Sequence, residues 1–370
     1  MGLQERQQNI KELQELRGTR VIVHINSDRR VAPGEPGLPA LQTKLATEAQ
    51  PFFYKALREV GHNPKLDLFL HTSGGQTDSV WPLVSLFREF GQQLNVLVPY
   101  KAHSAGTLVC LGADTVVMGE AGELSPVDPQ TGNQFNPVDE INKTTRRGIS
   151  VEDVTAFFDL AADPGKTSDQ REGSSRVDTN LAFQMLAQQV HPLALGNVNR
   201  SHRQIRELAR RLLATHRPTA SNDERSEIDT IVNTLTQGRY SHTDVLNRRE
   251  AQQLLGDHVV KRASEAEQKL MWKLYEQYAE VLSLDTTFSL QALVGDEQQK
   301  QVTITGAFIE TEQVSFVYKA VFWVIQRSSL PAGFTVQLQP GQQVPLIPGF
   351  PRELNADLRH IGWVNNEEGV

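Results

Sequence analysis

The segment from Leu66 to Gly106 places the tightest limits on what this chain can fold into. Two apolar runs of strand length, Leu66–His71 and Leu94–Val98, each end in a turn of small residues. The first turn reads Ser73-Gly74-Gly75 and the second reads Ala102-His103-Ser104-Ala105-Gly106, and each opens a helical pattern. A helix N-terminus leaves backbone N–H groups without intrahelical partners. A serine among small residues beside such groups is the arrangement that a serine nucleophile and its oxyanion hole require.

The N-terminal part of the chain alternates between strand-like and helical patterns. Strand-like runs occur at Val21–Ile25, Leu66–His71, Leu94–Val98 and Thr115–Met118, and helical patterns occur at Gln42–Val60, Asp78–Phe90 and Ala105–Leu111. This alternation predicts an α/β fold with a mostly parallel sheet and right-handed crossover helices. The strand-like runs are continuously apolar, as expected for strands that are covered on both faces.

The alternation stops near residue 133, where helical patterns begin to dominate, and we predict a helical insertion over about residues 133–237. The tail changes character again, because Val302–Ile309 and Val314–Ile325 are rich in β-branched and aromatic residues. These runs predict a small strand-rich C-terminal appendage, or extra strands packed on the main domain. We therefore expect a main domain over residues 1–285 and a C-terminal extension over residues 286–370.

Composition narrows the function classes. The net charge of the 370-residue chain is −7, so no basic surface for nucleic acid is visible, and we expect no nucleic-acid partner. The apolar runs are far too short to span a bilayer, and the N-terminus is charged throughout, unlike a secretory signal. We therefore expect no membrane span and a cytoplasmic location.

The single cysteine, Cys110, excludes an internal disulfide framework and a Cys-rich metal site. A thiol nucleophile is conceivable, but the position inside a helical pattern favours a buried core thiol. The sequence contains no H-E-x-x-H motif and neither of the glycine-rich phosphate-binding motifs. We therefore expect no metal and no cofactor.

The peptide Ala102–Gly106 differs by one residue from the nucleophile elbow G-x-S-x-G, since Ala102 stands at the first small position. The alternative interpretation is that Ser104 only caps the following helix. The turn at Gly74–Gly75 lets a substrate backbone approach closely, although two glycines also make an ordinary tight turn. The N–H groups of Gly75 and Ala105 are the candidates for holding an oxyanion.

Several stretches together resemble the Clp protease/crotonase superfamily, and within it the serine dehydrogenase proteinase (SDH) family of Clp-fold peptidases. The stretches are HTSGG, YKAHSAGTLVCLGADTVVMG, ELSPVDPQTG, HPLALGNV and SHTDVLNRREAQQLLG, which are spread over Leu66 to Gly256. The resemblance implies a Clp/crotonase-like peptidase domain over residues 1–285. It does not cover the strand-rich tail.

The resemblance places Ser104 on the nucleophile of the family and Gly75 and Ala105 on its oxyanion-hole positions. It also implies a triad in the order Ser104, Asp128, His242, with His242 as the base and Asp128 as its partner; triads are defined by geometry and not by chain order. Taken alone, a histidine in a turn such as His242 is usually a cap or a surface residue, and Asp128 is also consistent with a residue that caps its Pro-flanked loop.

Two other residues are rival bases. His191 lies in a stretch that matches the family, although a histidine before Pro192 is also typical of a helix end. Lys143 follows Ser104 by 143 − 104 = 39 residues, a spacing similar to that of a membrane-linked branch of the superfamily that uses a lysine base. Lys143 would make a Ser/Lys dyad, although its neighbours indicate a solvated segment.

The leading hypothesis is a serine peptidase with a peptide or protein substrate and no cofactor. The resemblance implies a homo-oligomer. Two other classes remain open: a crotonase-like acyl-CoA enzyme, which would use the paired N–H groups without a serine nucleophile, and a catalytically inactive oligomeric scaffold that recruits partners.

Overall fold

The computed structural model describes residues 2–127, 133–139, 143, 145–162, 179–217, 221–236, 244–331, 337 and 345–366. Within these residues, eight strands form one sheet in the order β11-β10-β9-β1-β2-β3-β5-β8. The five strands from β1 to β8 are parallel: β1 (Arg20–Asn26), β2 (Lys65–His71), β3 (Gln93–Val98), β5 (Thr115–Met118) and β8 (Val260–Arg262). The predicted α/β fold with a mostly parallel sheet is confirmed.

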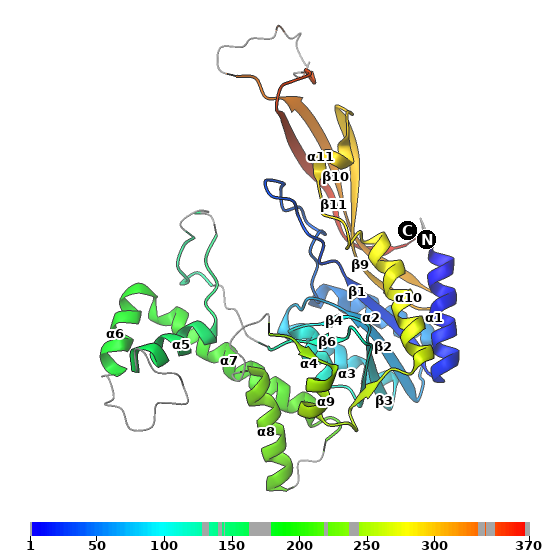
Figure 1. Cartoon of the computed structure of the whole chain (residues 1–370), viewed down its shortest axis with the longest axis vertical. Helices are drawn as coiled ribbons and strands as arrows, with labels where there is room; N and C mark the ends of the chain where they lie inside the picture. The colour runs from blue at the N-terminus through cyan, green and yellow to red at the C-terminus, as the bar shows by residue number, and fades with distance from the viewer. Residues whose placement is uncertain are drawn as a thin grey trace.

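Helices cover both faces of the parallel strands. On one face, α1 (Leu3–Arg17) and α10 (Glu265–Val281) lie side by side (Figure 1) and pack on alternate strand residues such as Val23, Phe69 and Leu97. On the other face, α2 (Gln50–Val60), α3 (Val80–Phe90) and α4 (Ala105–Leu111) pack on the intervening residues, such as Leu68 and Val96. Side chains alternate between the faces of a strand, so a continuously apolar strand feeds both cores.

The predicted helix over Gln42–Val60 is shorter than expected. The chain is extended at Leu45, which makes a parallel bridge to Gly75, and a 3-10 turn, η1 (Thr47–Ala49), precedes α2. A similar turn, η2 (Thr77–Ser79), precedes α3. The backbone pairing at Leu45 competes with helix formation and wins, because it satisfies the amide of Leu45 and that of Gln76 through hydrogen bonds of 2.9 and 2.8 Å.

A second, smaller sheet holds the segments around the second turn. It consists of β4 (Lys101–Ala102), β6 (Glu123–Leu124) and β7 (Leu246–Asn247), in that order. Helix α9 (Arg248–Leu255) follows β7 directly and begins with a capping box between Asn247 and Glu250. The sequence predicts this capping box, because Asn247 is followed three residues later by Glu250 at the start of a helical pattern.

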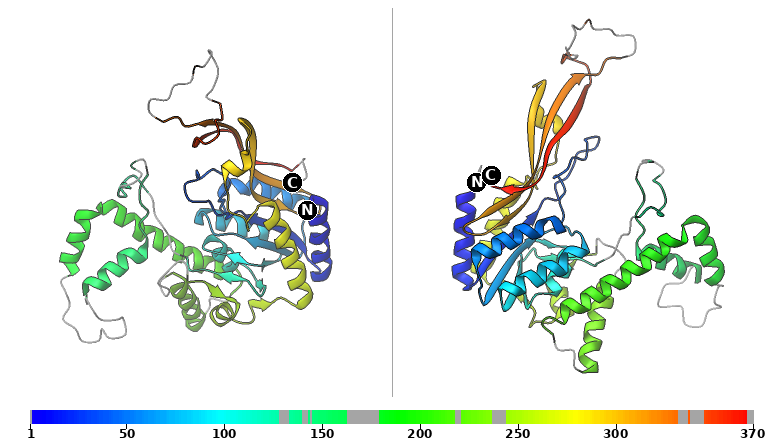
Figure 2. Two further views of the ribbon diagram at one scale, coloured as in Figure 1. Left: turned by 45° about the horizontal axis from the view of Figure 1, so that its top comes forward. Right: turned by 180° about the vertical axis from the view of Figure 1, so that it is seen from behind.

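Helices dominate the described part of residues 133–237, as predicted: α5 (Val151–Ala162), α6 (Thr179–Gln189), α7 (Pro192–Leu213) and α8 (Asn222–Thr236). Residues of the C-terminal half of α7 and of α8, including Leu212 and Ile231, belong to the core on the α4 face of the sheet. Helices α5 and α6, with the first half of α7, extend away from the sheet (Figures 1 and 2) and are called the helical arm below.

The C-terminal strands continue the main sheet instead of forming a separate one. Strand β9 (Gln299–Glu310) pairs antiparallel with β1, and β10 (Ser315–Ser328) and β11 (Arg352–Asn365) extend the sheet outward (Figure 2). We call β9, β10 and β11 the ribbon. A third apolar cluster packs the short helix α11 (Leu290–Val294) and Leu41 against the ribbon. The division of the chain at residue 285 stays a prediction.

Candidate active site

Ser104 is held in an unusual backbone conformation. Its φ is 49° and its ψ is −107°, and it lies immediately before α4, with its residue half-buried. A positive φ is uncommon for any residue except glycine and costs on the order of 1–3 kcal/mol, and such strain clusters at active sites. Ser104 is the N-cap residue of α4, but its side chain makes no capping hydrogen bond. The alternative that Ser104 acts as a side-chain cap therefore receives no support from the geometry.

A buried hydroxyl network fixes this strained turn. The backbone N–H of Ser104 donates to the Ser125 hydroxyl at 2.8 Å, and that hydroxyl donates to the Pro126 carbonyl at 2.9 Å. The Thr107 hydroxyl lies 2.8 Å from the Ala102 carbonyl and accepts from the Ser125 N–H at 3.0 Å. Sequence reasoning did not single out Ser125 or Thr107, because a small hydroxyl residue gives no signal until its partner is known.

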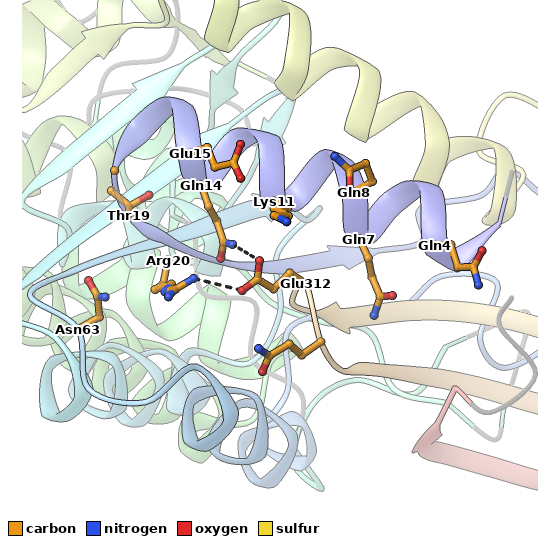
Figure 3. A pocket seen from close by; sticks show the side chains of 12 residues that line it. Gln4, Gln7, Gln8, Lys11, Gln14, Glu15, Thr19, Arg20, Asn63 and Glu312 are labelled. Atoms are coloured by element: carbon orange, nitrogen blue, oxygen red, sulfur yellow. Dashed lines mark hydrogen bonds and ion pairs between the residues drawn. The ribbon is translucent and has the colours of Figure 1, made fainter.

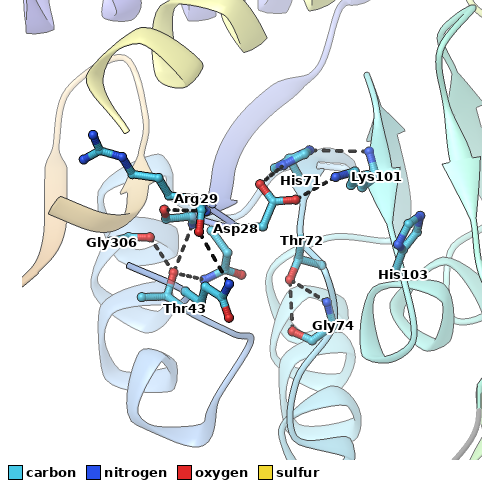
Figure 4. Close-up of polar contacts among 12 residues, drawn as sticks. Asp28, Arg29, Thr43, His71, Thr72, Gly74, Lys101, His103 and Gly306 are labelled. Carbon is cyan, nitrogen blue, oxygen red and sulfur yellow. Dashed lines mark hydrogen bonds and ion pairs between the residues drawn. The ribbon is translucent and has the colours of Figure 1, made fainter. Parts of the chain in front are cut away.

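The glycine turn after β2 lies against Ser104. The Thr72 hydroxyl accepts from the Gly74 N–H at 3.1 Å and donates to the Gly74 carbonyl at 3.0 Å (Figure 4). Gly74 has a φ of 115°, and a Cβ added there would stand 2.9 Å from the Cβ of Ser104 and 3.4 Å from its Oγ. A Cβ added at Gly75 would stand 2.0 Å from the Leu45 carbonyl oxygen. Both positions require glycine, one for its conformation and contact and the other for space.

Backbone pairing joins the two turns. Thr72 and Ala102 form a parallel bridge, in which the Thr72 N–H donates to the Lys101 carbonyl at 2.9 Å and the His103 N–H donates to the Thr72 carbonyl at 3.0 Å. Within the described residues, the N–H groups of Gly75 and Ala105 donate to no acceptor. Two amide donors in adjoining turns, both close to a serine, form the arrangement that binds a tetrahedral oxyanion.

A partly buried polar group, Asp28 with His71 and Lys101, adjoins the two turns (Figure 4); His71 is fully buried, and the side chains of Asp28 and Lys101 are 23% and 24% exposed. Lys101 Nζ lies 2.7 Å from one carboxylate oxygen of Asp28, and His71 Nε2 lies 3.9 Å from the other. The Lys101 N–H faces His71 Nδ1 at 3.4 Å, which assigns the imidazole proton to Nε2, on the side of Asp28. Asp28 follows β1, His71 ends β2 and Lys101 begins β4, so this group ties together the carboxyl ends of β1 and β2 and the start of β4.

The protonation states of this group follow from burial and charge. Burial lowers the pKa of His71, so its imidazole is neutral at pH 7. Burial acts to raise the pKa of Asp28, but the hydrogen bonds and charges of its partners outweigh burial and hold that pKa far below its ordinary value. Because His71 is neutral, Lys101 is the cation that holds the pKa of Asp28 low at pH 7. The pKa of Lys101 is raised, since the Asp28 carboxylate outweighs the effect of burial.

His103 is the neighbour of the nucleophile in sequence, and its side chain is directed elsewhere. Its Nε2 lies 3.1 Å from a carboxylate oxygen of Glu123 on β6. Burial first, and the charge of Lys101 second, lower the pKa of His103 to about 4. Burial also raises the pKa of Glu123.

The two predicted partners of Ser104, Asp128 and His242, lie outside the described residues. The small sheet nevertheless brings the flanking segments together. Leu124 of β6 pairs with Ala102 on one side and with Leu246 of β7 on the other. The segment that leads to Asp128 therefore runs beside β4, the strand that precedes Ser104, and the segment that follows His242 runs beside β6, one strand further out. The Val127 N–H, one residue before Asp128, donates to the Leu235 carbonyl at 2.8 Å.

The two rival bases lie elsewhere on the described surface. His191 is the N-cap of α7 in the helical arm; its Nδ1 accepts from the Leu193 N–H at 3.2 Å, and its ring stacks on Phe135. Lys143 is exposed in a turn. Within the described residues, the structure records no contact of His191 or Lys143 with Ser104. The thiol of Cys110 is fully buried and its pKa is raised by that burial, as a core thiol requires.

A polar groove with a volume of about 790 Å³ lies at the opposite end of the sheet, between α1 and the β9–β10 turn (Figure 3). Its lining includes Gln14, Arg20 and Glu312, and both Gln14 and Arg20 bond to Glu312. Ligands of open parallel sheets bind beyond the carboxyl ends of the strands, whereas this groove lies where β1 begins. It is therefore no part of the candidate active site.

Two searches of the described residues set further limits. None of the described helices combines the length and the apolar character that a bilayer crossing requires. The described residues also contain no group of three or more His, Cys, Asp and Glu side chains placed to hold a metal ion.

Comparisons with known proteins give partial matches. The chain is 30% identical over 149 residues to the uncharacterised protein MJ1495 of Methanocaldococcus jannaschii, and 31% identical over 128 residues to MJ0137 of the same organism. These matches cover 40% and 35% of this chain and 50% and 44% of the two relatives, so the chain spans about half the length of the curated relatives it matches.

Two solved structures match part of this chain at a low level of similarity. They are two mutants of the 1510-N membrane-bound stomatin-specific protease, one of them in complex with a substrate peptide. Both are 13% identical to this chain, with TM-scores of 0.35 and 0.34. The matches cover 61% and 60% of this chain and 79% and 72% of those structures.

A family model gives the most specific finding. Its match begins at residue 1 and ends at residue 163. It therefore includes both turns, the polar group of Asp28, His71 and Lys101, and the segment of Asp128. It stops before the ribbon and most of the helical arm. Over residues 1–163 the chain matches the family of ClpP-like SDH-type serine proteinases, which confirms the family resemblance for that part of the sequence.

Proposed function

We propose that this protein is a serine peptidase in which Ser104 attacks the peptide carbonyl. The observation that carries the proposal is the conjunction at Ser104: a strained, half-buried serine beside two amide donors without acceptors in the described residues. A nucleophile elbow uses a strained backbone to expose the hydroxyl, and the conformation of Ser104 is consistent with that use. The family match over residues 1–163 supports the same chemistry.

The proposed reaction follows the acyl-enzyme route. The oxygen Oγ of Ser104 bonds to the carbonyl carbon while the base takes its proton, and the carbonyl oxygen becomes an oxyanion that the N–H groups of Gly75 and Ala105 stabilise. The intermediate then expels the amine, which takes the proton from the base. Water then attacks the carbonyl carbon of the acyl-enzyme while the base takes a proton from it. Ser104 leaves with that proton, which regenerates the free serine and releases the acid.

His242 is the base in this proposal and Asp128 orients it. The small sheet supports this assignment, because β6 leads toward Asp128 and β7 follows His242, and β6 pairs with β4 on one side and with β7 on the other. The rivals receive less support: His191 is engaged as a helix cap, and Lys143 is exposed to solvent. A lysine base needs burial to lower its pKa toward neutrality.

The remaining expectations are part of the same proposal. The substrate is a peptide or protein, the chain assembles as a homo-oligomer, and it works in the cytoplasm. The other two classes, a crotonase-like acyl-CoA enzyme and an inactive scaffold, have no use for the strain at Ser104. Turnover of an acyl-CoA without labelling of Ser104 would favour the first of them, and neither activity would favour the second.

The test is covalent labelling with a fluorophosphonate, read by mass spectrometry. The wild-type chain is expected to be labelled at Ser104, and Ser104→Ala is expected to lose both the label and peptidase activity with an unchanged fold. The matched control is Ser73→Ala, since Ser73 is an exposed serine in the adjoining turn. Labelling that persists in Ser104→Ala, or that is lost in Ser73→Ala alone, would refute the assignment.

A further inference from the structure

A groove with a volume of about 460 Å³ begins at the glycine turn and ends on the ribbon. Gly75 and Gln76 line one end, and Tyr318 of β10 with Ile361 and Trp363 of β11 line the other. We call it the ribbon groove. Its volume lies within the range of sites that hold small molecules or side chains, about 300–1,000 Å³.

The position of the groove ties it to the reaction centre. Gly75 carries one of the two proposed oxyanion donors, and its neighbour Gly74 contacts Ser104, as shown by the 2.9 Å that would separate a Cβ at Gly74 from the Cβ of Ser104. A peptide whose carbonyl oxygen is bound by the Gly75 N–H therefore has a neighbouring side chain at the mouth of the groove. That geometry limits the occupant to a residue close to the scissile bond.

The walls of the groove indicate what kind of side chain fits. The rings of Tyr318 and Trp363 are 5.6 Å apart in an edge-to-face arrangement, and Trp363 is held in place by stacking on Phe52. Ile361 is 42% exposed beside them and adds apolar surface to the groove. Aromatic walls bind apolar and aromatic groups through burial and ring contacts.

The charges that line the groove favour neither an acidic nor a basic substrate side chain. Lys44 and Glu48, which also line the groove, carry opposite charges, so the groove as a whole offers no excess of either sign. The charge of Glu48 adds to burial in raising the pKa of Tyr318, so the phenol is neutral at physiological pH. A charged substrate side chain would lose part of its hydration here and would meet a like charge as well as an opposite one.

We infer that the ribbon groove is a specificity subsite that accepts a large apolar or aromatic side chain next to the scissile bond. This inference rests on the proposed peptidase function. It adds a role for the ribbon, because Tyr318, Ile361 and Trp363 all lie beyond the part of the chain that matches the peptidase family. Substrate preference is thus set by residues that are remote in sequence from the catalytic turns.

The first experiment compares cleavage of peptides that differ at one position, carrying Phe, Leu, Ala or Asp beside the cleaved bond. The full wild-type chain is expected to favour Phe and Leu by roughly ten- to hundredfold in kcat/KM. Ala46→Phe, which adds a ring to the groove lining, is expected to reverse that preference toward Ala. Tyr318→Ala is expected to weaken it. The matched control is Tyr54→Ala, since Tyr54 is a half-exposed tyrosine outside the groove.

The second experiment measures binding without catalysis. The Phe peptide is titrated into the Ser104→Ala chain by calorimetry, and Ala46→Phe in that background is expected to weaken binding roughly tenfold or more. Binding of the Phe peptide by Ser104→Ala together with an inactive wild-type chain would refute the peptidase proposal and support the groove. Cleavage with no residue preference, or with the same preference in Ala46→Phe and wild type, would overturn the groove assignment. Absence of both cleavage and binding would overturn both.

Discussion

The two ends of the parallel sheet differ in whether the polar groups near them have hydrogen-bond partners. At the amino ends of the strands, the buried carboxylate of Asp67 is bonded by Thr19 at 2.8 Å, by Asn95 at 2.7 Å and by Arg17. At the carboxyl ends, Gly75 and Ala105 keep amide donors without acceptors in the described residues, and Ser104 carries backbone strain. Satisfied groups stabilise a fold, while unsatisfied donors and strain persist where the surroundings hold them for chemistry. The difference indicates which end is the stabilising end and which is the reactive one.

The largest effect is expected from the base. His242→Ala should lower the labelling rate of Ser104 by about a thousandfold or more, because the serine hydroxyl then has no general base. His191→Ala and Lys143→Ala are the matched controls and should retain most of the labelling. Loss of labelling in Lys143→Ala alone would replace the triad by a Ser/Lys dyad.

The next effect concerns the oxyanion turn. Gly75→Val should lower kcat by roughly 10²–10³-fold, because its Cβ would meet the Leu45 backbone and displace the Gly75 donor. Gly196→Val is the control, since a Cβ there meets nothing within 4 Å. Circular dichroism must show the Gly75→Val chain folded, and near-normal turnover in a folded chain would remove Gly75 from the site.

At the stabilising end, the expected effect is on the fold and not on the chemistry. Asp67→Ala leaves Arg17 and Asn95 without their shared partner and should lower the free energy of unfolding by about 3–5 kcal/mol. The labelling rate per folded molecule should be unchanged. A drop in that rate, measured well below the melting temperature, would contradict the separation of the two ends.

The smallest effect tests the polar group of Asp28, His71 and Lys101 that adjoins the two turns. Asp28→Asn should reduce labelling of Ser104 by roughly tenfold, because Lys101 loses the partner that fixes β4, and misplacement of reacting groups is costly. Asp296→Asn removes an exposed ion pair with Arg352 and serves as the control. Equal labelling in the two variants would limit Asp28 to a structural role.

The same substitution carries a pH signature. The pKa of Asp28 in the folded chain lies below its unfolded value of about 3.9, so its stabilising contribution is complete above that value and is lost as the pH falls further. The difference in unfolding free energy between wild type and Asp28→Asn should therefore be smaller at pH 3 than at pH 7. Urea titrations at both values measure it, and a larger difference at pH 3 would contradict the assignment.

The sequence predicted the elements that depend on local pattern. The runs at Leu66–His71 and Thr115–Met118 are strands, Ala105–Leu111 is a helix with those bounds, and the capping box at Asn247 is present. The placement of Ser104 beside Gly74 was also foreseeable, because two consecutive parallel strands bring their following turns to one edge.

Other features depend on partners far away in the chain and gave no local signal. Asp28 is an unremarkable acidic residue until Lys101 and His71 meet it. The pairing of Leu45 with Gly75 overrides a helical pattern. The sequence left open whether the C-terminal strands form an appendage or pack on the main domain, because nothing near Val302 indicates that β9 pairs with β1. The roles of Asp128 and His242 stay predictions.

The pairing of β6 with β7 has a consequence for how this chain can vary. Leu124 and Leu246 are partners in the small sheet. The chain segment between them, which includes the helical arm, therefore leaves the small sheet and re-enters it at adjoining points. Loop-closure entropy grows only slowly with length, so an excursion fastened at both ends is inexpensive to lengthen, shorten or exchange. The helical arm can therefore vary in length and sequence among related chains while the pairing of β4 and β6 keeps Ser104 in place.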